Sequence, residues 1–134
     1  MKDAAELCRG LLRKARSDRT AMEASLSAQA LDAACFHAQQ LTEKCLKAFL
    51  AHRGVTFPYT HNLTKLVELS AGLDATFRSL QPTVAPLTPY AVELRYDDSF
   101  WPSQQVAEEA RASALAVLRF VLDRLPAYLT KDAE

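Results

Sequence analysis

The stretch Leu31–Ala51, LDAACFHAQQLTEKCLKAFLA, is the part of the sequence that decides the fold. It contains neither Gly nor Pro, and Thr42 is its single β-branched residue, so it predicts one long helix. At about 100° per residue, apolar side chains fill half of the circumference, which places this helix at the centre of a domain. These side chains are Leu31, Ala34, Cys35, Ala38, Leu41, Cys45, Leu46, Ala48, Phe49 and Leu50.

One edge of the same apolar face carries a polar stripe. His37, Gln40, Lys44 and Lys47 follow one another there at intervals of three, four and three residues. This spacing puts the four side chains on one line along the helix. Polar groups at the border of a buried surface make a candidate binding site, and a solvated helix edge is the alternative interpretation.

Length and composition indicate one globular domain. The chain has 134 residues, of which 49% are hydrophobic and 24% charged, enough to bury a core without disulfides or metal. Sixteen basic side chains balance sixteen acidic ones, so the chain lacks the overall basic charge of a dedicated nucleic-acid binder, although a local patch stays possible. Because no membrane-spanning run or signal-peptide pattern occurs, we expect a cytoplasmic protein without membrane contact.

The three cysteines, Cys8, Cys35 and Cys45, each lie within an apolar helical pattern and form no CxxC pair. An odd number of cysteines at such positions predicts reduced, buried thiols that pack as small hydrophobic groups. A catalytic or redox-active thiol is the alternative interpretation.

Residues before the central stretch predict a first amphipathic helix from Lys2 to about Arg16. Apolar residues repeat there with helical spacing, and basic residues occupy the other face. Residues 17–27 are polar and rich in serine, which predicts a connection between helices. In this connection the hydroxyl of Ser25 or Ser27 is placed to cap the central helix.

Shorter elements are predicted after the central helix. Gly54 can adopt the left-handed backbone that closes a helix. Thr60 is placed to cap a third helix that ends at Gly72, with His61 in its first turn. Asp74 is placed to cap a further turn.

Prolines divide the next part of the chain. Thr88 and Pro89 predict the cap and first position of a fresh helix that carries Arg95. Residues 95–102 then predict an aromatic loop, because the residue before Pro102 cannot continue as a helix.

Ser103 is placed to cap a long last helix that Pro126 ends. No strand pattern or internal repeat occurs, so the sequence predicts one all-α domain over residues 1–134, an antiparallel bundle of four to five helices. The predicted buried face of the last helix consists of Val106, Ala110, Ala114, Val117, Val121, Leu122 and Leu125.

The common catalytic and cofactor motifs do not occur in this sequence. Its three glycines are scattered and cannot form a loop that cradles phosphate. No two of its histidines have the spacing of a zinc helix, and none has thiolate or carboxylate partners at ligand spacing. We therefore expect no metal and no cofactor, and we assign no catalytic residue.

Three segments together resemble the HEPN domain (higher eukaryotes and prokaryotes nucleotide-binding). They are FHAQQLTEKCLKA at 36–48, THNL at 60–63 and YAVELRY at 90–96. The likeness keeps the order and spacing of the family from about residue 3 to residue 125. It implies a helical bundle that is usually homodimeric and is often paired with a minimal nucleotidyltransferase, in many cases as toxin and antitoxin.

The resemblance also bears on catalysis. Active toxins of the family are metal-independent ribonucleases with an Arg that holds phosphate and a His, four to six residues apart, for acid–base chemistry. Arg95 stands at the Arg position, whereas Phe100, Trp101 and Pro102 occupy the positions of the His. Losing a general acid or base lowers a rate by about 10²- to 10⁴-fold, which argues against ribonuclease activity. Asp97 is placed to pair with Arg95 and weaken its hold on phosphate.

The sequence leaves three functions open. The first is a non-catalytic partner of a minimal nucleotidyltransferase that binds nucleotide or RNA phosphate and stacks bases on aromatic rings. The second is a ribonuclease in which His37 or His61 folds next to Arg95. The third is a structural homodimer formed by the last helix and the aromatic loop. The predicted binding residues are His37, Gln40, Lys44, Lys47, Arg95 and Tyr96.

Overall fold

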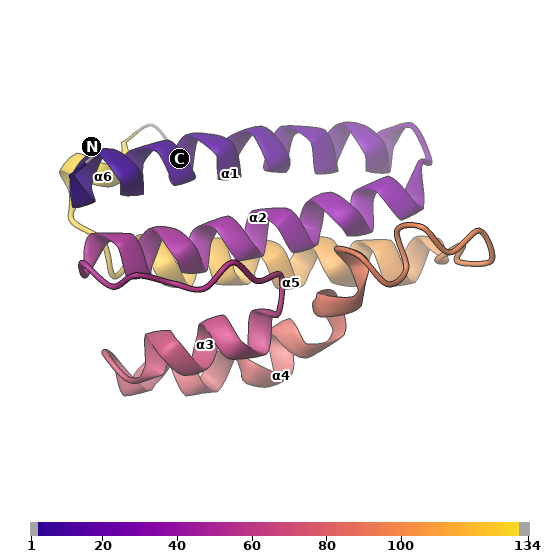
Figure 1. Ribbon diagram of the computed structural model, residues 1–134. Coiled ribbons are helices and arrows are strands. Elements are labelled where there is room, and N and C mark those ends of the chain that lie inside the picture. The colour runs from indigo at the N-terminus through magenta and orange to yellow at the C-terminus, as the bar shows by residue number, and fades with distance from the viewer. Residues whose placement is uncertain (1–2, 132–134) are drawn as a thin grey trace.

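The computed structural model describes residues 3–131, in which six α-helices and no strand occur (Figure 1). This confirms the predicted all-α fold. None of the described helices has the length and apolar character needed to cross a bilayer. The long helices are α1 (Ala4–Ser27), α2 (Leu31–His52) and α5 (Gln104–Leu122). The shorter elements are α3 (Leu63–Ala71), the 3₁₀ helix η1 (Ala75–Leu80), α4 (Gln81–Val84), the 3₁₀ helix η2 (Ala85–Tyr90) and α6 (Ala127–Thr130).

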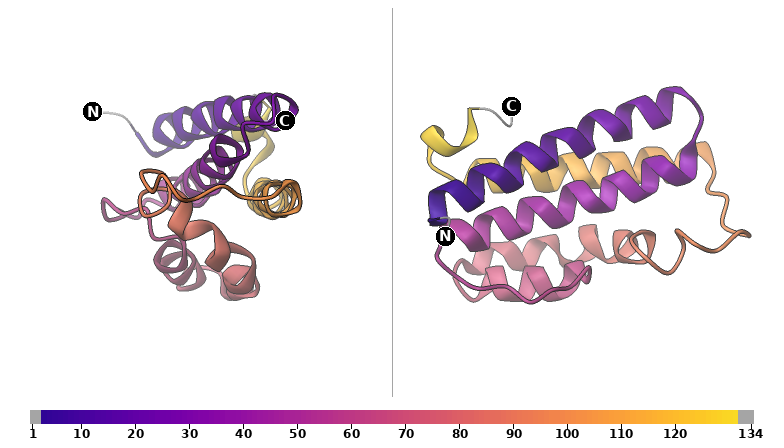
Figure 2. Two further views of the ribbon diagram at one scale, coloured as in Figure 1. Left: turned by 90° about the vertical axis from the view of Figure 1, so that its right-hand side faces the viewer. Right: turned by 45° about the horizontal axis from the view of Figure 1, so that its top comes forward.

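Helix α2 is the axis of the bundle, as the sequence predicts. Helices α1 and α5 pack along two of its sides, and α3 and the short helices pack near a third (Figure 2). Its apolar face is buried, with Leu41, Leu46 and Leu50 fully enclosed. The predicted bounds differ from the observed ones by the single residue His52.

Helix α1 is longer than predicted. It begins after Asp3, whose carboxylate accepts a backbone N–H of the first turn, and it continues past Arg16 to Ser27. No Gly or Pro interrupts residues 17–27, and Met22 within them is fully buried. The predicted connection is wrong because this burial outweighs the modest helix propensity of Ser, Thr and Asp.

The link between the first two helices also differs from the prediction. Ser25 and Ser27, the expected caps of the central helix, lie inside α1, and Ala30 precedes α2 without a side-chain cap. Gln29 turns the chain there with a φ of 63°. The predicted start of the first helix, Lys2, lies outside the described residues.

The segment after α2 places a histidine outside a helix. Gly54 has a φ of 72°, as predicted for a residue that closes α2. Asn62 rather than Thr60 caps α3, since the Asn62 side chain accepts the N–H of Lys65. The Thr60 hydroxyl instead accepts the N–H of Asn62 at 3.1 Å. His61 therefore precedes α3 and does not lie in its first turn.

The proline-containing segment folds into consecutive short helices, so the fresh helix predicted from Thr88 is wrong. Pro89 lies inside η2, and residues 91–96 form turns. Pro82 and Pro86 are tolerated because they stand in the first two positions of α4 and η2, which need no intrahelical donor. Asp74 caps η1 as predicted, and its carboxylate accepts the N–H of Thr76.

Ser103 caps α5 as predicted. The inward side chains of α5 pack on α2 as expected, but Leu122 is half-buried and Val106 is 37% exposed. Val106 faces out because it lies about 100° round the helix from the buried Ala107. The chain ends its described part with a single turn, α6, after Pro126.

All three cysteines are buried thiols without a disulfide, as predicted. Burial raises the pKa of Cys8 and of Cys35 to about 11. Burial raises the pKa of Cys45 to about 12, with a further contribution from Asp18 that Lys44 partly offsets. Because the thiolate is the reactive form, these cysteines act as core residues.

Candidate functional site

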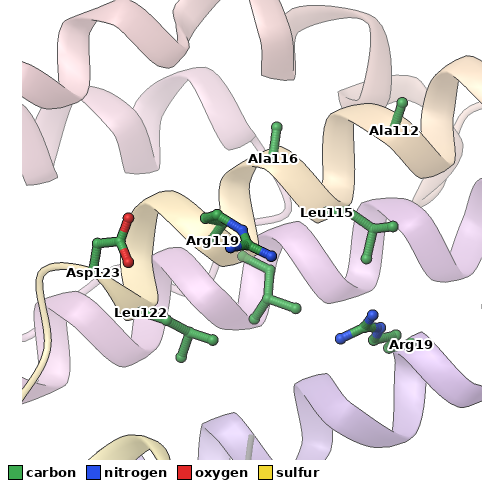
Figure 3. A pocket seen from close by; sticks show the side chains of 8 residues that line it. Arg19, Ala112, Leu115, Ala116, Arg119, Leu122 and Asp123 are labelled. Atoms are coloured by element: carbon green, nitrogen blue, oxygen red, sulfur yellow. The ribbon is translucent and has the colours of Figure 1, made fainter. Parts of the chain in front are cut away.

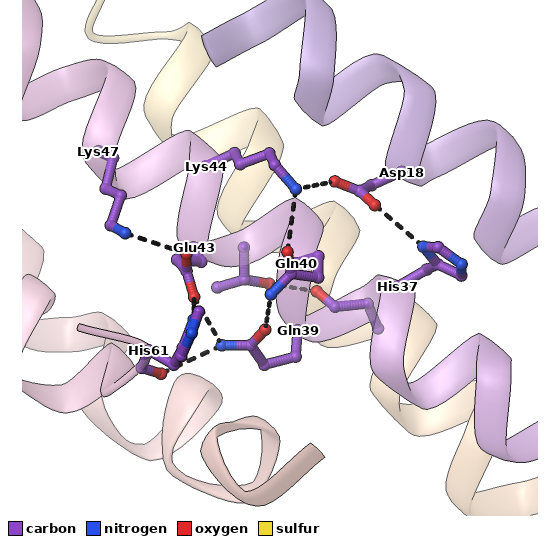
Figure 4. Close-up of polar contacts among 10 residues, drawn as sticks. Asp18, His37, Gln39, Gln40, Glu43, Lys44, Lys47 and His61 are labelled. Atoms are coloured by element: carbon purple, nitrogen blue, oxygen red, sulfur yellow. Dashed lines mark hydrogen bonds and ion pairs between the residues drawn. The ribbon is translucent and has the colours of Figure 1, made fainter. Parts of the chain in front are cut away.

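A network of polar side chains runs along one side of α2 (Figure 4). It joins α1, α2 and the segment before α3, and it includes all four residues of the predicted polar stripe. We call it the α2 network. Its members are Asp18, His37, Gln39, Gln40, Glu43, Lys44, Lys47 and His61.

Asp18 organises the part of the network that lies between α1 and α2. One of its carboxylate oxygens is 2.9 Å from Nδ1 of His37, and the other accepts from Nζ of Lys44. Lys44 also donates to the side-chain oxygen of Gln40 at 3.1 Å. The Asp18 side chain is 12% exposed, so these bonds connect the two helices in a partly dehydrated place.

Glu43 organises the other part. Its Oε1 is 2.7 Å from Nδ1 of His61, and its Oε2 accepts from Lys47 at 3.0 Å. Gln39 donates both to Glu43 Oε1, at 3.2 Å, and to the backbone carbonyl of His61, at 3.1 Å. These bonds hold the segment before α3 against α2.

The amides of Gln39 and Gln40 join the two parts. Nε2 of Gln40 donates to Oε1 of Gln39 at 2.8 Å, so a continuous chain of hydrogen bonds reaches from His37 to Lys47. Gln39 is fully buried, and its amide has partners for both its oxygen and its nitrogen. A satisfied network of this kind fixes one arrangement of the surrounding helices.

The electrostatics of Glu43 follow from its burial and its donors. Burial acts to raise the pKa of this carboxyl group, but hydrogen bonds from His61, Lys47 and Gln39, with the charge of Lys47, outweigh it. The net result is a pKa below the ordinary value, and Glu43 is a carboxylate at neutral pH. An ionised carboxylate only accepts hydrogen bonds, so Nδ1 of His61 carries the shared hydrogen.

The network changes the interpretation of the two predicted lysines. Lys44 is bound to Asp18, and Lys47 is bound to Glu43 and is 9% exposed. Each positive charge therefore already has a carboxylate partner, and the stripe does not form a free cationic surface. Lys47 also lies 5.6 Å from the centre of the Phe57 ring, which shields it further from solvent.

Arg95 and Tyr96 lie outside the network, in the turns that follow η2. The Arg95 guanidinium carbon is 4.1 Å from the centre of the Phe36 ring and 5.3 Å from that of Tyr96. We call Phe36, Arg95 and Tyr96 the Arg95 patch. Within residues 3–131, no carboxylate lies at ion-pair distance from Arg95. Tyr96 is 77% exposed, so the patch faces solvent.

The expected pair between Asp97 and Arg95 does not form. Asp97 accepts instead from the backbone N–H and the hydroxyl of Ser99, at 2.9 and 2.6 Å. These bonds lower the pKa of Asp97, against a small opposing effect of burial. The Asp97 carboxylate is therefore bonded within a local turn, and the N–H groups of the Arg95 guanidinium form no bond with it.

Phe36 connects the Arg95 patch to the α2 network. Its ring lies edge to face against the ring of His37, with 5.1 Å between the centroids, and Arg95 lies against the same ring. His61 contacts Glu43 instead, and Glu43 lies about 10 Å along α2 from Phe36, at 1.5 Å per residue. Of the two histidines predicted to fold next to Arg95, His37 is therefore the one that shares a neighbour with it.

Other aromatic residues lie close in sequence to Arg95 and Tyr96. Tyr90 stacks on Phe100, with 5.6 Å between the ring centroids. Trp101 is 72% exposed, and its indole N–H donates to the carbonyl of Asp98 at 3.0 Å. The polar end of Trp101 is thus satisfied, and the apolar part of its ring is open to solvent.

Sequence reasoning missed the two carboxylates that organise the network. Glu43 carried a signal, since it falls near the buried side of α2, with Gln39 and Lys47 each four residues away. Asp18 carried none, because it lay in the predicted connection and its partner His37 is distant in sequence. No group of three or more His, Cys, Asp or Glu side chains in the described part of the chain is arranged to hold a metal ion.

Fold and site together define a helical-bundle domain with a polar network along its central helix and an exposed arginine beside it. A profile of the HEPN domain family matches residues 8–125, and the chain belongs to this family. The chain is similar to the crystal structure of TT1696 from Thermus thermophilus, with 28% identity, a TM-score of 0.76, and coverage of 88% of this chain and 98% of that one.

A second structure supports the fold. The chain is similar to the crystal structure of ST0689, described as an archaeal HEPN homologue, with a TM-score of 0.71 at 21% identity. That match covers 92% of this chain and 98% of the other. No curated protein matches the sequence.

Proposed function

We propose that this HEPN-domain chain is a non-catalytic binding protein that holds the phosphate of RNA or of a nucleotide at Arg95. Its partner in this proposal is a minimal nucleotidyltransferase, in a toxin–antitoxin-like pair. The observation that carries the proposal is the Arg95 guanidinium, which lies against Phe36 and Tyr96 without a protein carboxylate among the described residues. A stacked guanidinium with free donors suits a phosphate, which it binds through two parallel hydrogen bonds.

The surroundings of Arg95 supply the other elements of a nucleotide site. Tyr96 exposes ring surface on which a base can stack. His37 touches Phe36, and Gln40 stands one helical turn from Phe36 on the same face of α2. Lys44 and Lys47 act indirectly in this proposal, since they hold the carboxylates of the network.

The test measures binding of a fluorescein-labelled single-stranded RNA and of labelled nucleotides by fluorescence anisotropy. We expect Arg95→Ala to weaken binding at least about 10-fold. Arg95→Lys should have an affinity between those of the wild type and Arg95→Ala, because lysine keeps the positive charge but loses the paired N–H donors of the guanidinium. Arg78→Ala is the matched control, since Arg78 is exposed on η1 away from these rings. Unchanged affinity of Arg95→Ala contradicts the proposal.

A ribonuclease is the second candidate, favoured by the shared contact of His37 and Arg95 with Phe36. Asp18 orients His37 through Nδ1, and no protein group among the described residues bonds its Nε2. The test is RNA cleavage in EDTA by the wild type and by Arg95→Ala, His37→Ala and His61→Ala. Cleavage lost in Arg95→Ala and one histidine variant establishes this function, and absence of cleavage by the folded wild type excludes it.

The proposal includes a homodimer formed through the segment after η2. Large apolar side chains are exposed there, with Val92 at 53% and Trp101 at 72%, and they offer apolar surface for a protein contact. The expected face of the last helix contributes less, because α5 turns most of it toward α2. Sedimentation equilibrium tests this point: Val92→Ser combined with Trp101→Ser should convert dimers to monomers, whereas Tyr128→Ser should not.

A further inference from the structure

A groove of about 750 Å³ runs between α1 and α5 (Figure 3). It exists because both helices pack on α2 while making few contacts with each other. No residue of the Arg95 patch or of the α2 network lines it. The groove is therefore a surface that the proposed function leaves unused.

The α5 wall of the groove is an apolar stripe with helical spacing. Ala112, Leu115, Ala116 and Leu122 lie along it. Small alanines let a second helix approach closely, and leucines between them supply apolar contact, as in complexes where an amphipathic helix lies in a groove. The lining contains no aromatic ring on which a base could stack, which favours a protein helix over a nucleotide.

Two arginines border this stripe from the two walls. Arg19 extends from α1 and Arg119 from α5 (Figure 3). Neither forms an ion pair among the described residues, although the charge of Arg19 contributes to lowering the pKa of Glu23. Glu23, one turn along α1 from Arg19, is bound to Arg111 instead. The lining holds two arginines and one aspartate, Asp123, so its net charge is positive, which is complementary to a helix that carries carboxylates next to its apolar face.

Charge also argues against a second copy of this chain as the occupant. The outward surface of α1 is the other apolar strip of this region, with Leu7 and Leu11, but Arg13 and Lys14 border it. Docking this strip into the groove would bring further cations to a lining whose net charge is already positive. Like charges across an interface suppress a wrong partner.

We propose that the groove between α1 and α5 binds an acidic amphipathic helix of a partner protein. Leucine-type side chains of that helix contact Leu115 and Leu122, and its carboxylates pair with Arg19 and Arg119. This inference rests on the proposed function in one respect, that the chain has a protein partner, and it does not require RNA binding at Arg95.

The experiment uses a fluorescein-labelled synthetic helix of about 18 residues, roughly as long as α5, with leucines on one face and glutamates beside them. A matched peptide carries lysines in place of the glutamates. We expect the full chain to bind the glutamate peptide at least about 10-fold more tightly than the lysine peptide. The double variant Arg19→Glu with Arg119→Glu should reverse this order, and Leu115→Glu should abolish binding.

Controls outside the groove are Val106→Glu on α5 and Arg78→Glu on η1, which should bind like the wild type. Equal affinity for the two peptides, or no binding by the folded wild type, overturns the proposal. A homodimer that Leu115→Glu dissociates also overturns it, because the occupant is then a second copy. Arg95→Ala separates the two proposals, since it should weaken RNA binding and leave peptide binding unchanged.

Discussion

The α2 network and the Arg95 patch touch through Phe36, but their charged groups differ. Those of the network are paired and mostly buried, whereas that of the patch is exposed and has no ion-pair partner within residues 3–131. In the network, Asp18 and Glu43 are mostly buried, and each holds one histidine and one lysine. In the patch, Arg95 lies on the surface with aromatic neighbours and no carboxylate partner among the described residues. A charge that is satisfied and buried fixes structure, whereas a charge left unpaired at the surface is available to a ligand. Changes in the network should therefore alter stability, and changes in the patch should alter binding.

Glu43→Ala should have the largest effect. It leaves Lys47 buried without its carboxylate and removes the acceptor of Gln39 and His61. Breaking a buried pair in this way costs about 3–5 kcal/mol of unfolding free energy. Urea denaturation followed by circular dichroism measures it, with the exposed Glu93→Ala as control. A loss within about 1 kcal/mol, the range of exposed ion pairs, would show that the buried network stabilises the fold no more than a surface ion pair does.

Low pH should also destabilise the fold through Glu43, but by less than Glu43→Ala does, because a protonated Glu43 keeps part of its hydrogen bonding. The pKa of Glu43 is lowered in the folded state from an ordinary value of 4.5. The carboxylate therefore stabilises the fold fully above about pH 4.5, and this contribution is lost as the pH falls through the lowered folded-state value. Denaturation midpoints from pH 7 down to pH 3 measure the effect, with Glu43→Gln showing a flatter dependence than the wild type. Identical slopes would assign the acid sensitivity to other carboxylates.

Asp18→Asn should cost less than Glu43→Ala, about 1.5–3 kcal/mol, the range for hydrogen bonds to charged groups. Asp18 has donors from His37 and Lys44, and the asparagine amide keeps one acceptor oxygen. Thermal unfolding measures the difference. A cost above that of Glu43→Ala would reverse the order of the two halves of the network, and would place the main constraint between α1 and α2.

The sequence predicts the fold wherever a strong local signal exists. The central helix follows from its apolar periodicity without Gly or Pro. The Ser103 cap and the left-handed Gly54 follow from residue types that favour those positions. The second half of α1 was missed because Ser, Thr and Asp make up five of the eleven residues 17–27, and the contacts that make this part helical come from distant residues. The absence of Gly and Pro there was the usable signal.

The candidate site follows the same rule. Helical spacing predicted that His37, Gln40, Lys44 and Lys47 share one side of α2, and the structure joins them in one network. Spacing along one helix does not reveal which groups another helix brings opposite it, so the carboxylate of Asp18 was not foreseen. That these residues and Arg95 bind a nucleotide stays a prediction.

Phe36→Leu is a sharper probe of the patch than removal of the arginine. It removes the ring that Arg95 lies against and leaves the positive charge in place. A cation–π contact at an exposed site is worth about 0.5–1 kcal/mol, so RNA affinity should fall roughly 2- to 5-fold. Fluorescence anisotropy measures this, and Phe57→Leu, which alters a ring beside Lys47, is the control. A loss as large as that of Arg95→Ala would show that Phe36 itself contacts the ligand.

Glu23→Gln should have the smallest effect, and it separates burial from pairing as the origin of the contrast. Glu23 accepts two hydrogen bonds from Arg111, with geometry as direct as that of Glu43, but both side chains are about 40% exposed. Hydrogen bonds from Arg111 lower the pKa of Glu23 against a smaller opposing effect of burial. Solvent screens such a pair, so its loss should cost no more than about 1 kcal/mol and still less in high salt. If urea denaturation showed a cost like that of Glu43→Ala, pairing alone and not burial would determine which charges hold this fold.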